Sequence, residues 1–181
     1  MNRTPLLNAA RVDNFEILQL LLNHPEIDLN ATSTGDTNIL DWSITAEDSE
    51  AVKTILKLGE KFVKKPENKE MNSVKLAISR GNAEIFDILV KEGMIEVNER
   101  LENQLTPIIL ASIFESIEIV RYLIQFGKSV DVNAVDDSGR TALHHASDEG
   151  FVDIVKLLVD VPGIQLDIED SEFVSLFLCF I

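Results

Sequence analysis

The sequence contains few of the residues on which several classes of protein depend. It has one cysteine, one tryptophan and one tyrosine among 181 residues, with eight glycines and five prolines. A single cysteine cannot form a disulfide within the chain or supply a thiolate cluster for a metal. No apolar run approaches the roughly 18 residues that a membrane helix requires, and no amino-terminal secretory signal is recognisable. These absences favour a soluble, cytoplasmic protein without a membrane partner.

Basic residues are scarce as well. The chain has 16 lysines and arginines against 31 aspartates and glutamates, for a formal net charge of -15. Phosphate attraction supplies most non-specific affinity for nucleic acid, so no nucleic-acid partner is predicted. One exception is the lysine-rich band at residues 53–75, with seven lysines against three acids. We interpret it as a solvated helix face with its loop, because it lacks the arginines typical of nucleic-acid patches.

What the sequence does contain is a repeat. Small residues recur at steps of 34 or 35 residues: Ala9, Ser43, Ala77, Ala111 and Ala146. Three residues before each lies an aliphatic side chain: Leu6, Leu40, Val74, Ile108 and Leu143. Seven residues after each, an acid opens an apolar run: Glu16, Glu50, Glu84, Glu118 and Asp153. A further position reads Asn30, Lys64, Asn98, Asn133 and Asp167. Spacing kept over the whole chain indicates a repeat protein.

Each repeat predicts two short helices. Thr4-Pro5 and Thr106-Pro107 suit a helix start, because proline there loses no hydrogen bond and threonine can cap. The small residue lies where a neighbouring helix must approach closely. Gly81 and Gly150 mark the break before the second helix, whose acid lies near the positive end of the helix dipole. A connection rich in Asn, Asp, Ser and Gly leads into the next repeat.

A period of 34 residues also suits tetratricopeptide units, but the aromatic pattern that those units need is lacking. The stretch Asp136-x-x-Gly139-x-Thr141-Ala142-Leu143-His144-x-Ala146 instead resembles the ankyrin repeat. The resemblance covers residues 4 to 168. It implies an all-α ankyrin-repeat solenoid of about five helix-turn-helix units with projecting finger loops. The predicted domain spans residues 1–168, with repeats starting near residues 4, 38, 72, 106 and 141.

Three segments depart from this pattern. The third finger, residues 64–70, lacks the asparagine and glycine of the others, and Lys128-Ser129 brings one extra residue into a loop. Local distortion is expected at both. Residues 169–181 are predicted to form an incomplete sixth repeat or an apolar C-terminal helix. Because residues 173–181 are almost wholly apolar, we interpret them as a tail folded back on the fifth repeat, as a dimer contact or as the start of a truncated longer protein.

Signatures of catalysis are scarce, and no catalytic residue, metal site or cofactor is predicted. A phosphate-binding Gly-rich loop, a Gly-x-Ser-x-Gly elbow and a His-Glu-x-x-His motif are all missing. The strongest candidate is His144-His145 followed by Asp148-Glu149, because residues four apart share a helix face and can chelate a cation. The resemblance implies instead that His144 forms hydrogen bonds between neighbouring turns.

Five other side chains are expected to have structural roles. Trp42 is expected to fill the core and Cys179 to pack within the apolar tail. Asn98 and Asn133 resemble sites that asparaginyl hydroxylases modify in ankyrin proteins, as does Asn30. Satisfying backbone groups of the loops explains these asparagines without any modification.

The resemblance places a protein partner on the concave side, lined by finger tips and the carboxyl ends of the first helices. The candidate binding residues are Arg80, Arg100, Glu102, Leu105, Ile113, Phe114, Asp137, Arg140, Asp148 and Glu149. Ile113 and Phe114 are the candidate anchors, since interface energy concentrates in a few aromatic and aliphatic residues. The alternative is that Phe114 turns back under its own second helix.

The sequence therefore favours a non-catalytic scaffold that binds an unidentified protein. Two alternatives from other classes stay open. The chain can be the targeting or regulatory ankyrin module of a longer enzyme or channel. It can also be a small metal-dependent hydrolase built around His144.

Overall fold

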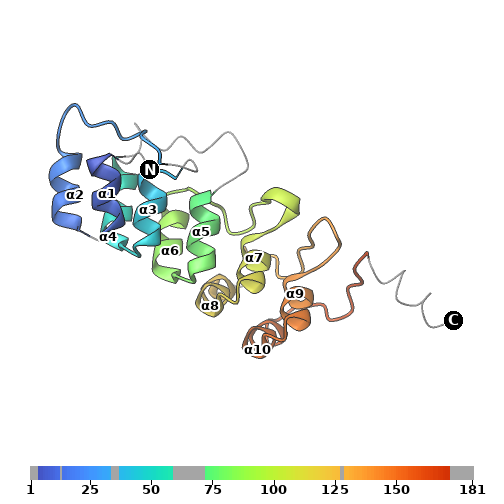
Figure 1. Cartoon of the computed structure of the whole chain (residues 1–181). Coiled ribbons are helices and arrows are strands. Elements are labelled where there is room, and N and C mark those ends of the chain that lie inside the picture. The colour runs from blue at the N-terminus through green and yellow to red at the C-terminus, as the bar shows by residue number, and fades with distance from the viewer. Residues whose placement is uncertain (1–3, 13, 34–36, 59–71, 127–128, 172–181) are drawn as a thin grey trace. The chain divides into compact units, whose positions relative to one another are not determined.

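The computed structural model describes residues 4–12, 14–33, 37–58, 72–126 and 129–171, and within these ranges it contains helices and no strand (Figure 1). Ten α-helices lie in the described residues: α1 (Pro5–Arg11), α2 (Phe15–Leu22), α3 (Ile39–Thr45), α4 (Ser49–Lys57), α5 (Asn72–Arg80), α6 (Ala83–Lys91), α7 (Pro107–Ile113), α8 (Ile117–Gln125), α9 (Ala142–Asp148) and α10 (Val152–Val159). The predicted all-α fold of paired short helices is confirmed.

The helices belong to two compact units, Met1–Met94 and Ile95–Ile181. In the first unit α3 packs against α1 and α5, while α4 packs against α2 and α6. In the second unit α7 packs against α9, and α8 against α10. Within each unit the first helices of the repeats therefore form one row and the second helices another (Figure 1).

The small residues of the repeat lie where the first helices meet. Ala9, Ser43, Ala77, Ala111 and Ala146 are all at most 4% exposed. A side chain of one carbon, or a serine, lets the neighbouring helix approach closely, and close packing leaves little room for a larger group. The predicted role of this position is confirmed.

Capping residues begin several helices as predicted. The Thr4 side chain accepts a hydrogen bond from the backbone N–H of Leu7, and Thr141 accepts one from that of His144. The predicted cap is wrong at Thr106, whose buried Oγ1 has no hydrogen-bond partner among the described residues. Thr106 starts α7 through its backbone instead, because its carbonyl accepts from the N–H of Leu110 at 2.9 Å.

The turns after α3, α5, α7 and α9 each contain a residue with a left-handed backbone. Gly81 and Gly150 have φ of 69° and 74°, the region that glycine enters without strain. Glu47 and Glu115 occupy the equivalent positions with φ of 59° and 55°. A side chain at this φ costs about 1–2 kcal/mol, so these two turns are held by the helices on either side.

Several expectations fall outside the described residues. They concern the third finger at residues 64–70, most of the lysine-rich band, Lys128 and the apolar tail with Cys179. A dimer contact through that tail remains a prediction. Among the described helices, none combines the length and the apolar character needed to cross a membrane.

Enlarging the small residue on α5 tests the packing of the first helices. Ala77→Leu is expected to destabilise the first unit by about 1–3 kcal/mol, because three extra carbons must enter a fully packed contact. Trp42 fluorescence in a urea titration reports on this unit. Ser79→Leu, an exposed position on the same helix, is the matched control and should change stability little. Equal effects of the two substitutions would contradict the packing argument.

Relieving the strained turn after α7 should stabilise the protein. Glu115→Gly is expected to raise the unfolding free energy by about 0.5–1 kcal/mol, since the gain from removing the side chain exceeds the added freedom of the unfolded chain. Glu115→Ala removes the same charge but keeps the Cβ, so it should give no gain. Thermal unfolding followed by circular dichroism compares the two variants, and a gain from alanine would point to charge rather than strain.

Candidate functional site

Two finger loops precede α7 and α9 in the second unit. Each is closed by a backbone hydrogen bond, from Leu101 N–H to the Leu105 carbonyl at 2.9 Å and from Asp136 N–H to the Arg140 carbonyl at 3.0 Å. The N–H of Asp137 donates to the Asn103 carbonyl at 3.1 Å and so joins the two fingers. The fingers thus form a continuous edge on this unit.

Two asparagines fix the base of the fingers. Asn98 donates through Nδ2 to the Ser129 carbonyl at 2.6 Å, and its Oδ1 accepts from the N–H of Asp131 at 2.8 Å. Asn133 repeats this pattern one repeat later, with Gly163 and Gln165 as its partners, both at 2.8 Å. The predicted structural role of these two asparagines is confirmed.

The tip of the fourth finger is exposed. Glu102 lies in the short 3-10 helix η2 (Glu102–Gln104) and faces solvent, while Leu105 is half-buried. Arg100 donates to the carbonyls of Gln104 and Val135. Its guanidinium therefore braces the two fingers and has fewer donors left for a partner.

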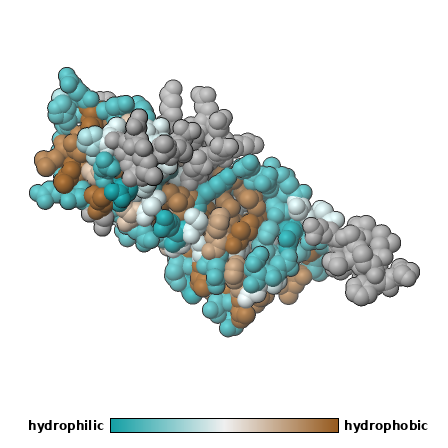
Figure 2. Space-filling model, in the orientation of Figure 1, coloured by the Kyte–Doolittle hydropathy of each residue, from teal (hydrophilic) through white to brown (hydrophobic). Residues whose placement is uncertain are grey.

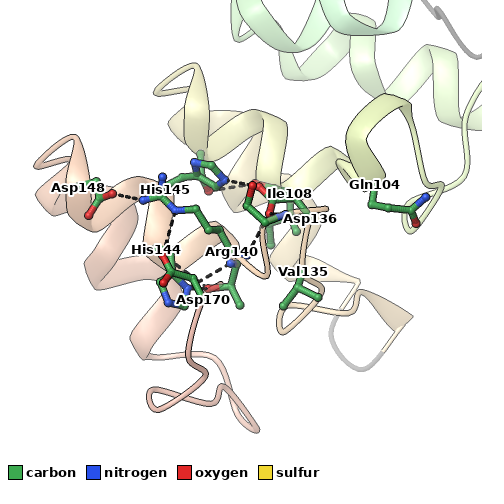
Figure 3. A network of polar contacts seen from close by, with 12 residues as sticks. Gln104, Ile108, Val135, Asp136, Arg140, His144, His145, Asp148 and Asp170 are labelled. Carbon is green, nitrogen blue, oxygen red and sulfur yellow. Dashed lines mark hydrogen bonds and ion pairs between the residues drawn. The ribbon is translucent and has the colours of Figure 1, made fainter. Parts of the chain in front are cut away.

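Arg140 is braced in the same way in the fifth finger. Its guanidinium pairs with Asp148 at the end of α9 and, at 3.6 Å, with Asp170 (Figure 3). The Arg140 side chain is 21% exposed. It ties the finger to its helix, and the sequence analysis, which selected Arg140 as a candidate contact residue, missed these internal partners.

The two histidines have structural partners. His144 Nδ1 lies 2.9 Å from the Thr141 hydroxyl and accepts from the N–H of Thr141 at 3.1 Å, so its described bonds cap its own helix. His145 Nε2 lies 2.8 Å from Asp136 Oδ2 rather than facing Glu149 (Figure 3). Among the described residues no three histidine, cysteine, aspartate or glutamate side chains are arranged to hold a metal.

Asp136 is the most strongly anchored carboxylate of this network. Burial raises its pKa, but the N–H groups of Arg140 and Ser138, at 3.0 and 2.9 Å, and His145 outweigh this effect and lower the pKa below its usual value. The sequence analysis did not select Asp136. Its place at the start of the Asp-x-x-Gly turn was the available signal, because an aspartate there accepts hydrogen bonds from the next residues.

The helix ends complete the surface. Phe114 follows the last residue of α7 and is 46% exposed, and Ile113 beside it is half-buried. Phe114 therefore is not covered by its second helix. The equivalent positions in the next repeat, at the end of α9, are Asp148 and Glu149, and both are exposed.

Nine of the ten predicted binding residues lie in the second unit. The tenth, Arg80, is an exposed residue at the end of α5 in the first unit. We call the nine the finger–helix surface: Arg100, Glu102, Leu105, Ile113, Phe114, Asp137, Arg140, Asp148 and Glu149.

Stacked helix pairs with projecting, polar fingers define a class of repeat proteins that present binding surfaces. Residues 67–170 match a family model described as ankyrin repeats in three copies, and residues 1–31 match a model of one ankyrin repeat. The first match alone covers more than half of the chain. The chain belongs to the ankyrin-repeat family, and ankyrin repeats are generally protein–protein interaction modules.

Similar stretches occur in much longer proteins. Neurogenic locus notch homolog protein 2 of Homo sapiens is 34% identical over 88 residues, which cover 49% of this chain and 3% of that protein. Rabankyrin-5 of Homo sapiens is 36% identical over 84 residues, covering 46% of this chain and 7% of that protein. Neurogenic locus notch homolog protein 1 of Danio rerio is 35% identical over 95 residues, covering 52% and 4%. The matched part of the chain therefore spans less than a tenth of the length of these relatives.

The charge of Asp136 makes part of the stability depend on pH. Because its pKa is lower in the folded chain, its contribution is complete above the usual aspartate pKa of about 3.9 and is lost as the pH falls through the folded value. Asp136→Asn keeps one oxygen acceptor but not the charge, and should cost about 1–2 kcal/mol at pH 7.

Urea titrations at pH 7 and below pH 4 measure the effect. The difference between the parent chain and Asp136→Asn should shrink at the lower pH, where the aspartate becomes protonated. Asp136→Ala loses the acceptor as well and should remain less stable than Asp136→Asn at both pH values. A difference between the parent and Asp136→Asn that is independent of pH would contradict a role for the charge.

Proposed function

We propose that the chain is a non-catalytic interaction module that binds a protein partner on its finger–helix surface. Membership of the ankyrin-repeat family supports the general function. The single observation that carries the location is Phe114, an aromatic ring 46% exposed on a surface where Leu105 and Ile113 are half-buried and the other residues are charged. Burial of such a ring in a partner gives a large gain, and aromatic residues often dominate interface energy.

The network behind this surface supports the same proposal. Arg100 and Arg140 hold the fingers against each other and against α9. Side chains that are held before binding lose less entropy when a partner docks. Three acidic side chains on the same surface are exposed: Glu102, Asp137 and Glu149. In this proposal they supply polar contacts that select the partner.

The alternative of a metal-dependent hydrolase around His144 gains no support from the geometry. His144 caps α9 and His145 pairs with Asp136, so both imidazoles have structural partners. The non-catalytic role rests on this pairing together with the family.

A nucleic-acid partner is not proposed for the lysine-rich band. Lys53, which is its first residue, lies 2.8 Å from Glu50 and 3.6 Å from Glu84. These acids offset its charge, as expected for a solvated helix face.

A cytoplasmic location remains our proposal, supported by the single cysteine of the chain.

A second candidate function is a targeting or regulatory module within a longer protein. The observation that favours it is the size of the relatives, in which the matched repeats form 3% to 7% of the whole length. The binding surface would be the same for both candidates. They differ in whether partner binding is the function of the protein itself or targets or regulates a longer protein.

The double variant Ile113→Ala/Phe114→Ala tests the proposed surface. Proteins captured by the parent chain from a lysate are identified by mass spectrometry, and the affinity of the leading partner is then measured with purified protein. We expect at least a tenfold weaker affinity, because an interface anchor contributes about 2 kcal/mol or more. Stability should fall by less than about 1 kcal/mol, since Phe114 is half exposed.

Phe126→Ala is the matched control, because Phe126 is a phenylalanine of the same unit that is 40% exposed. It lies after α8, outside the finger–helix surface, and should leave the affinity unchanged. An unchanged affinity of the double variant would reject Ile113 and Phe114 as anchors, and a loss of helical structure would place them in the core.

A further inference from the structure

Two helix faces, one on α2 in the first unit and one on α10 in the second, present apolar residues whose equivalents in other repeats are more covered. On the second helix of each repeat, the position of Ile17 is occupied by Ala51, Ile85, Ile119 and Ile154, all 0% exposed. Ile17 itself, on α2, is 47% exposed, and Leu20 on the same helix is 69% exposed. In the space-filling view apolar surface gathers at the α2 end of the first unit (Figure 2). The face of α2 that a preceding second helix would cover is open.

The opposite face is open on α10. Val152 is 60% and Val159 41% exposed. Their equivalents on the other second helices are buried or half-buried: Phe15, Ser49, Ala83 and Ile117 for the first position, and Leu22, Leu56, Val90 and Ile124 for the second. This is the side on which α8 receives α10, since Ile117, the equivalent of Val152, lines a shared pocket with Asp153 and Lys156 of α10.

Charges on these two faces match a contact that exists inside the chain. On α4, Lys53 lies 2.8 Å from Glu50 and also 3.6 Å from Glu84 on the following second helix, α6. On α10, Lys156 occupies the position of Lys53 and lies 3.4 Å from Asp153, the equivalent of Glu50. Among the described residues, no second helix follows α10.

The acid that completes this pattern is available on α2. Glu16 occupies the repeat position of Glu84 and is exposed at the open face. A second helix row that continued from α10 into α2 would therefore place Lys156 opposite Glu16, in the relation that Lys53 has to Glu84. The same step would cover Ile17 and Leu20 with Val152 and Val159.

We propose that two copies of this chain associate head to tail, with the α2 face of one copy packed against the α10 face of the other. The contact extends the packing between successive second helices from one molecule to the next. Because the two faces differ, each copy keeps one open face, and longer assemblies can grow. The finger–helix surface takes no part, so this contact does not depend on the proposed function.

Sedimentation equilibrium of the full chain measures the association, in buffer of physiological ionic strength, where the Debye length of about 8 Å screens most of the repulsion between acidic copies. Over a concentration range of about a hundredfold the average mass should rise. Leu20→Glu and Val152→Glu should each remain monomeric, since each blocks one of the two faces. Phe126→Glu, outside both faces, is the control and should associate like the parent.

An equimolar mixture of Leu20→Glu and Val152→Glu is the decisive sample. Each variant retains the face that the other lacks, so the mixture should form dimers and nothing larger. If Leu20→Glu alone abolishes association and Val152→Glu has no effect, two α2 faces meet and the proposal is wrong. A parent chain that stays monomeric also overturns it, and leaves residues 172–181 of the same chain as the candidate cover for α10.

Charge reversal tests the register of the contact. Glu16→Lys and Lys156→Glu should each weaken association about two- to fivefold, the range expected for an exposed ion pair. The double variant carries both reversals and should recover the parent affinity. Losses that add in the double variant would show that the two residues do not meet. Neither change should affect capture of a partner, whereas Ile113→Ala/Phe114→Ala should affect capture and leave association intact.

Discussion

Close approach of neighbouring first helices is the constraint on which this structure depends. The contact is possible because one position in every repeat carries alanine or serine, and each of these side chains is at most 4% exposed. A helix of seven to nine residues is too short to be stable alone in water. Each pair is therefore stable only through its neighbours, and the small residue determines how closely they pack.

The helix rows in turn set the spacing of the fingers. Asn98 and Asn133 each connect their own loop to the next one through a donor and an acceptor. Arg100 and Arg140 then fasten the fingers to each other and to α9. Polar groups at the base of the fingers are thus used for structure, and the residues left for recognition are those at the tips and helix ends.

Much of the fold was predictable because it rests on periodic features. The small position and the acid in the first turn of each second helix recur every 34 or 35 residues with a shared physical role, and at the Asn position Asn98 and Asn133 form the same pair of hydrogen bonds. The internal partners of the candidate binding residues were harder to predict from the sequence, because each ion pair or hydrogen bond depends on the geometry of its own loop. The ion pair of Arg140 with Asp170 joins residues that no repeat relates, and the hydroxyl of Thr106 shows that the same residue type at one position does not guarantee the same bond.

Position within the array also changes what a residue does. Ile17 and Ile85 occupy the same place on their helices, yet the first is 47% exposed and the second fully buried. The difference comes from the neighbour and not from the residue, so a pattern read along the sequence cannot reveal it. In a repeat protein the interior positions specify a common packing, whereas the end faces and finger tips determine which molecules the array meets. Since these surfaces lie on different helices and loops, we expect substitutions of Phe114 to alter the proposed partner binding without altering the proposed contacts at α2 or α10.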